Sequence, residues 1–141
     1  MNKIEDLISR GKIKKCNFSD EMYKKEFRVG VKDLESAKVS FEAENYKWAT
    51  IQAYYAIFHA ARALIYKSGY REKSHGALKD ILKELYVKTN KLSMSIYISL
   101  KNGMYLREAA DYNEKYSKED AENIIISINK ALKEIEKLID N

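Results

Sequence analysis

The chain has 141 residues, a length that fits one domain able to bury a core without disulfides or metals. Hydrophobic residues make up 45% and charged residues 33%, which excludes a disordered or fibrous chain. The net charge of +5 is compatible with a nucleic-acid partner but does not demand one. No apolar run reaches the ~20 residues that span a bilayer, so we expect a cytoplasmic protein with no membrane segment.

Cysteine and histidine are too sparse for the common metal and redox sites. Cys16 is the only cysteine, so it can form no internal disulfide and offers no zinc framework. The two histidines, His59 and His75, fall in separate predicted helices and have no HExxH spacing. Because a glycine-rich phosphate loop is also missing, we expect neither a metal nor a cofactor.

The first part of the chain predicts a short helix and then a long one. Residues 1–10 can form a helix ended by Gly11, and residues 1–18 read as a short N-terminal extension that ends in a basic connector. Ser19 is a good N-cap for a helix of about 25 residues with apolar side chains at steps of three and four. Gly30 inside this helix costs about 1 kcal/mol relative to alanine, and we interpret it as a close contact between helices.

The rest of the chain predicts three or four further helices. The most apolar helix starts at Asn45 and runs to about Lys67 with Gly69 as its stop, so it should be the most enclosed. A loop over residues 69–74, a short amphipathic helix, a helix over 93–113 and a last helix capped by Ser117 follow. These elements predict a single all-α domain over residues 1–141, an up-and-down bundle of four to five helices.

A seam of polar side chains runs along the most apolar helix. Its members are spaced 3, 4, 3 and 4 residues apart and share one helix face: Gln52, Tyr55, His59, Arg62 and Tyr66. One interpretation is structural: the seam faces another helix or a second subunit, and Asp111 or Glu108 neutralises Arg62. The other is a cleft for a phosphate-containing ligand, because the planar guanidinium donates two parallel hydrogen bonds to phosphate.

A second candidate site surrounds His75. Ser74 is expected to cap a helix whose first turn holds His75. The positive end of this helix, together with Lys67, Arg71 and Lys73, would attract an anion.

Three stretches in order carry a resemblance to a known family: YYAIFHAARALI at 54–65, SHGALKDIL at 74–82 and YLREAADY at 105–112. Together they resemble HEPN domains over residues 25–138, most closely the small stand-alone archaeal and bacterial branch. The resemblance implies a five-helix domain that commonly forms a homodimer. Many HEPN proteins are metal-independent RNases, often toxins encoded beside a minimal nucleotidyltransferase.

The resemblance also implies an RNase motif of arginine, four to six residues, histidine, and then x-Tyr. Arg107 matches the arginine, whereas the histidine position falls on Tyr112 and the later tyrosine position on Glu114. A tyrosine, with a pKa near 10, is a poor general base at neutral pH, yet it can donate a hydrogen bond to a phosphate or stack on a base. A purely structural interpretation of Arg107 is an ion pair with Asp111, four residues on.

The sequence is compatible with three functions. The first is a dimeric RNA- or nucleotide-binding module that works with a minimal nucleotidyltransferase. The second is a metal-independent endoribonuclease toxin, and the third a non-catalytic module that docks another protein. The candidate catalytic residues are Arg107, Tyr112 and His59. The candidate ligand-binding residues are Arg62, Tyr55, Asp111, His75 and Lys73.

Overall fold

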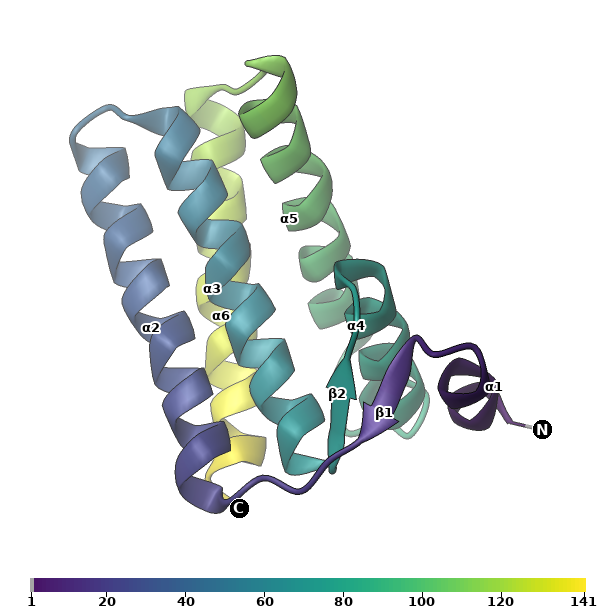
Figure 1. The fold of residues 1–141 in the computed structure, drawn as a ribbon. Coiled ribbons are helices and arrows are strands. Elements are labelled where there is room, and N and C mark those ends of the chain that lie inside the picture. Colours follow the sequence, from purple (N-terminus) through teal and green to yellow (C-terminus); the bar gives the residue numbers. More distant parts are fainter. Residues whose placement is uncertain (1) are drawn as a thin grey trace.

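The computed structural model describes residues 2–141, which fold into a bundle of helices. The four long helices, which run side by side in Figure 1, are α2 (Asp20–Glu42), α3 (Tyr46–Lys67), α5 (Met94–Asn113) and α6 (Lys118–Ile139). The shorter helical elements are α1 (Lys3–Ser9), α4 (His75–Leu82) and η1, a π-helical turn (Lys83–Val87) that continues α4. The predicted all-α, up-and-down bundle is confirmed.

Side-chain caps fix where these helices begin. Ser19, Asn45, Ser74 and Ser117 each accept a hydrogen bond from the backbone N–H three residues further on, as their sequence positions predict. Helix ends are set by backbone geometry: Gly69, with φ of +86°, lies just beyond α3, where the left-handed conformation costs glycine little. The predicted boundaries therefore hold to within a residue or two.

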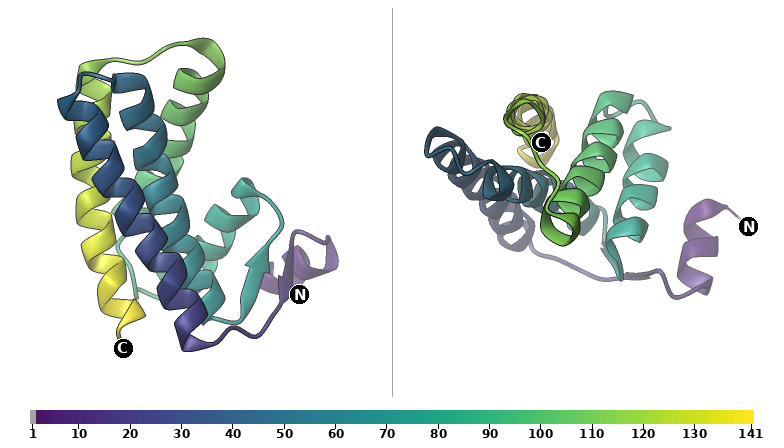
Figure 2. Two further views of the ribbon diagram at one scale, coloured as in Figure 1. Left: turned by 60° about the vertical axis from the view of Figure 1, so that its left-hand side comes forward. Right: turned by 90° about the horizontal axis from the view of Figure 1, so that it is seen from above.

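Helix α3 is the central and most buried helix of the bundle, as its apolar composition predicts. It packs against α2, α5, α6 and α4, and its alanines at 49, 53, 56, 60, 61 and 63 are fully buried. Figure 2, viewed from above, shows α2 on one side of α3 and α5 and α4 on the other. Gly30 is a point of close approach, since a Cβ there would lie 2.7 Å from the carbonyl oxygen of Ala56. The expected helix contact at Gly30 is confirmed.

Two short strands correct the prediction of a basic connector and a loop. β1 (Ile13–Lys15) pairs antiparallel with β2 (Tyr70–Glu72), with Ile13 opposite Glu72. Ile13 of β1 and Leu7 of α1 are both buried. Strands of three residues that pair across more than fifty positions leave almost no local pattern, which is why periodicity missed them. No helix within residues 2–141 is both long and apolar enough to cross a bilayer.

Candidate functional site

Arg107 of α5 reaches across to the aromatic face of α3. Its Nη2 donates a hydrogen bond to the hydroxyl of Tyr55 at 3.0 Å. The guanidinium carbon lies 5.9 Å from the ring centre of Tyr54, 5.6 Å from that of Tyr55 and 5.2 Å from that of Tyr112. The Arg107 side chain is only 14% exposed, so aromatic groups and a neutral hydroxyl hold its cationic head.

The charge of Arg107 is only loosely balanced. The ion pair expected with Asp111 is present, but Oδ2 lies 3.7 Å from Nε, beyond hydrogen-bonding distance. Nε is buried, and no group in the described part of the chain accepts a hydrogen bond from it. A planar cation with its Nη2 anchored and no hydrogen-bonded carboxylate is suited to receive an anion.

His75, in the first turn of α4, joins the same group of side chains. Its Nδ1 lies 2.7 Å from the hydroxyl of Tyr54, and its ring centre lies 4.4 Å from that of Phe58. Burial lowers the pKa of His75 below its ordinary value, and the positive charges of Arg107 and Arg62 lower it further. The imidazole is therefore neutral near pH 7. Burial also raises the pKa of Tyr54, so its hydroxyl keeps its proton.

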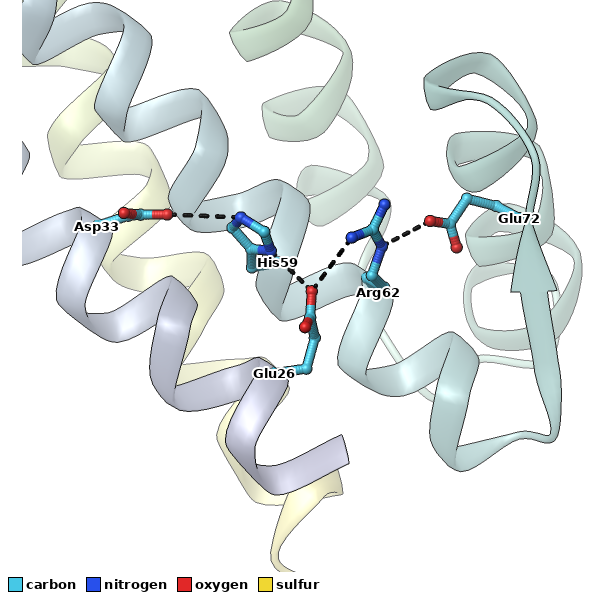
Figure 3. A network of polar contacts seen from close by, with 5 residues as sticks. All are labelled: Glu26, Asp33, His59, Arg62 and Glu72. Atoms are coloured by element: carbon cyan, nitrogen blue, oxygen red, sulfur yellow. Dashed lines mark hydrogen bonds and ion pairs between the residues drawn. The ribbon is translucent and has the colours of Figure 1, made fainter. Parts of the chain in front are cut away.

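Two further seam residues, His59 and Arg62, belong to a network of ion pairs (Figure 3). Nδ1 of His59 lies 2.7 Å from Oε1 of Glu26, and its Nε2 lies 3.7 Å from Oδ2 of Asp33. The same Glu26 oxygen is 3.5 Å from Nη1 of Arg62, whose Nε donates to Glu72 at 2.6 Å. This network joins α2, α3 and β2.

The partners expected for Arg62 were wrong. Its carboxylates come from Glu26 and Glu72, not from Asp111 or Glu108, because β2 brings a buried acid beside α3 where the sequence predicts only a loop. Within the seam, the structural interpretation therefore describes Arg62 and His59.

The predicted residues thus form two groups that meet at Phe58. The first group surrounds Arg107, which contacts Tyr55, Asp111 and Tyr112 directly and is linked to His75 through Tyr54. The second group is the ion-pair network, to which His59 and Arg62 belong. The Arg62 guanidinium carbon lies 4.4 Å from the Phe58 ring centre, on which His75 also packs.

The cations expected around His75 are dispersed. The side chain of Lys67 donates to the carbonyls of Leu138 and Ile139 at the end of α6 and to a backbone oxygen of Asn141 beyond it, so it is not available to an anion at His75. Lys73 is exposed next to β2, where its backbone N–H donates to the carbonyl of Lys12. The anion site expected here therefore consists of His75 and the two arginines near it, Arg62 and Arg107.

Sequence reasoning missed four residues that shape the site: Tyr54, Phe58, Glu26 and Glu72. The two aromatics lie outside the predicted polar seam, although Tyr54 directly precedes Tyr55 and carries a hydroxyl that a buried site must satisfy. Glu72 lies in the segment read as a solvated loop, so nothing local marks its burial. Across residues 2–141, no group of three or more histidine, cysteine, aspartate or glutamate side chains has an arrangement that could hold a metal ion.

The structure thus defines a class: an up-and-down helical domain in which an arginine of its third long helix, α5, is held against the aromatic core helix α3. The HEPN domain family matches residues 23–138, and the chain belongs to that family. It is 35% identical over 116 residues to "Putative toxin MJ0605" of Methanocaldococcus jannaschii, covering 76% of this chain and 86% of that protein. It is 31% identical over 97 residues to "Putative toxin MJ0142" of the same organism, covering 67% of this chain and 65% of that protein.

Proposed function

We propose that this chain is a toxin-like HEPN protein whose Arg107 site binds RNA by clamping a backbone phosphate. The observation that carries the proposal is the environment of Arg107: a neutral hydroxyl holds its guanidinium, and the nearest ion-pair carboxylate is 3.7 Å away. Arg62 is the opposite case, because Glu72 neutralises it at 2.6 Å. The names of the two relatives support the toxin-like role.

Tyr112 gives the site a way to hold a base as well as a phosphate. Its ring lies beside the Arg107 guanidinium and is 69% exposed. An exposed aromatic ring next to a cation is the combination that single-stranded RNA binders use, with about 1–3 kcal/mol per stacked base. We therefore propose single-stranded RNA as the ligand, with Arg107 on the phosphate and Tyr112 on the base.

The direct test is RNA affinity, measured by fluorescence anisotropy with a labelled single strand across a salt series. Arg107→Ala should weaken binding at least tenfold and reduce the slope of log K against log salt by about 1. Arg28→Ala is the matched control, because Arg28 is an exposed arginine on α2 and its loss changes the net charge equally. Equal effects of the two substitutions would contradict a specific phosphate site.

The stacking role of Tyr112 has its own matched pair. Tyr105 lies on the same helix, two turns earlier, and is 72% exposed. Tyr112→Ala should weaken RNA binding by about 1–3 kcal/mol, whereas Tyr105→Ala should change it little. If neither substitution changes the affinity, Tyr112 has no part in the site.

We extend the proposal to assembly: a homodimer that works with a minimal nucleotidyltransferase. Membership of the HEPN family supports this, as do apolar side chains that are nearly half exposed on α5 and α6: Met94, Ile98 and Ile126. Light scattering should give twice the 16.4 kDa chain mass, and Ile98→Asp should shift the protein toward the monomer. A wild-type monomer at micromolar concentration would contradict the dimer, and failure to co-purify with a co-expressed minimal nucleotidyltransferase from the same genome would contradict the partner.

A further inference from the structure

We propose that the groove between α2 and α6 is a docking site for an acidic amphipathic helix of a partner protein. This groove is separate from the Arg107 site, to which α3, α4 and α5 contribute the side chains. The proposal is therefore independent of RNA binding and adds a second functional surface to the molecule.

Two adjoining hollows between α2 and α6 make up the groove. The two helices run side by side, as the left view of Figure 2 shows. The hollows have volumes of about 460 and 180 Å³ and form one continuous groove, because they share lining residues: Phe27, Val31, Glu35 and Glu136. Along α2 the groove extends from Lys24 to Lys38, about 21 Å at 1.5 Å per residue, which matches about four turns of a docked helix.

The floor of the groove is apolar. Phe27 and Leu34 of α2 contribute to it, and so do Leu132 and Ile139 of α6, each at most 6% exposed. Val31 is half-buried and lines both hollows. A concave apolar floor between two helices suits the ridge of apolar side chains on an amphipathic helix, with anchors three and four residues apart.

A row of three cations borders the groove on α2: Lys24, Arg28 and Lys32. Their spacing of four residues places them along one side of the helix, where like charges repel each other. None of the three forms an ion pair with a carboxylate within residues 2–141. A row of carboxylates on a bound helix would balance this repulsion, so the α2 rim is complementary to an acidic partner.

The α6 rim sets a limit on how that partner is built. Glu136 and Asp140 line the same hollow as the three cations but form no ion pair with them. Over the whole groove, five lining side chains are cationic and three are carboxylates. The groove is thus positive on balance, and its occupant should be acidic along the edge that faces α2.

Two other occupants fit the groove less well. An anionic membrane surface is broad and negative throughout, so it would meet Glu136 and Asp140 unfavourably and would not enter a groove between two helices. A second copy of this chain would have to insert a different face into the groove. Such a head-to-tail contact closes only as a ring and otherwise extends into a filament.

The test uses designed helical peptides as probes, with binding to the full chain measured by fluorescence anisotropy. The acidic probe has about 18 residues, with leucine on one helix face and glutamate at the flanking positions. The control probe carries lysine in place of every glutamate. The acidic probe should bind about tenfold more tightly than the control, and its affinity should fall as salt rises. Equal binding of the two probes, or no binding of the acidic probe at the highest soluble concentration, would overturn the proposal.

Arg28 lies in the middle of the cationic row and provides the sharpest variant. Arg28→Glu should weaken binding of the acidic probe about tenfold and strengthen binding of the lysine probe, because it reverses the charge that the probe meets. Lys101→Glu is the matched control, since Lys101 is exposed on α5 and its reversal changes the net charge equally. The control should change either affinity by no more than about twofold. If the two variants behave alike, net charge rather than the groove governs binding, and the proposal fails.

The thermal stability of Arg28→Glu separates docking from folding. The substitution places a carboxylate four residues from both Lys24 and Lys32, so two repulsions become two attractions. The melting temperature should therefore rise while binding of the acidic probe is lost. A loss of binding together with a lower melting temperature would indicate damage to the fold and would count against the docking site.

Val31 tests the apolar part of the groove. Val31→Asp should weaken binding of the acidic probe by about tenfold or more, because it places a charge where the apolar ridge would pack. Val39→Asp is the control on the same helix, since Val39 is 70% exposed and lines neither hollow. Equal losses in the two variants would contradict a contact inside the groove.

Two further results would assign the groove to a different occupant and overturn the proposal. The first is flotation with phosphatidylserine vesicles that Arg28→Glu abolishes, in a protein that does not bind the acidic probe. The second is a drop in the molar mass measured by light scattering for Val31→Asp but not for Val39→Asp, which would make the groove a contact between copies of this chain.

Discussion

Arg62 and Arg107 show at the scale of single residues how carboxylates decide what an arginine can do. Both guanidinium groups lie close to the aromatic side chains of α3. Arg62 donates to Glu72, a side chain only 3% exposed, and the second carboxylate oxygen of Glu72 is buried without a hydrogen-bond donor in the described chain. Arg107 bonds to a neutral hydroxyl instead. Arg62 is therefore neutralised by a buried carboxylate, whereas the carboxylate nearest to Arg107 lies 3.7 Å away.

This contrast predicts stability losses of different size for the same substitution at the two arginines. Arg62→Met should lower the free energy of unfolding by about 3 kcal/mol, because it leaves the Glu72 carboxylate buried without a counter-charge. Arg107→Met should lower it by no more than about 1 kcal/mol. Urea denaturation of both variants measures the difference, and adding Glu72→Met to Arg62→Met should recover most of the loss. Similar losses for the two single variants would contradict the assignment.

At the scale of elements, the tight α2–α3 contact depends on one glycine. A Cβ at position 30 would lie 2.7 Å from the carbonyl oxygen of Ala56 and 3.1 Å from the backbone nitrogen of Ala60, and neither backbone atom can rotate away. Gly30→Ala should therefore destabilise the protein by about 1–3 kcal/mol despite the better helix propensity of alanine.

Gly76→Ala is the control for this substitution. Gly76 lies in the first turn of α4, and a Cβ there would meet no atom within 4 Å. Thermal unfolding should show this variant unchanged or slightly more stable, by up to about 1 kcal/mol. A Gly30→Ala variant as stable as Gly76→Ala would mean that α2 and α3 can separate at little cost.

The elements also show what the sequence could and could not predict. Caps and apolar periodicity are local, so the long helices were predicted with their boundaries, and the enclosed position of α3 followed from its composition. The strand pairing joins segments more than fifty residues apart, and the partners of Arg62 come from two other elements, α2 and β2. Glu72 looks like a solvated loop residue until β1 covers it, and no spacing within residues 69–74 reveals that. For the same reason, the contact between Tyr54 and His75 required the structure.

At the scale of the whole molecule, the N-terminal segment is bound to the rest of the fold. The HEPN match begins at residue 23, and the sequence predicts residues 1–18 as an extension. Figure 1 nevertheless shows β1 alongside β2, next to α4. Ile13 is 1% exposed and lies opposite Glu72, the acid that holds Arg62. The segment therefore pairs with the strand that carries Glu72 and leads into His75.

Ile13→Ala should test this coupling, because it removes a fully buried side chain and should lower the free energy of unfolding by about 2–5 kcal/mol. Lys14→Ala, at the exposed neighbouring position, should change it by less than about 0.5 kcal/mol. Hydrogen exchange at the backbone amides of β2 and α4 should accelerate in the Ile13 variant more than exchange in α6, since β1 pairs with β2 alone. Uniform acceleration across all helices would instead mean that Ile13 belongs to one cooperative core, and an unchanged stability would make residues 1–18 a dispensable addition to the HEPN domain.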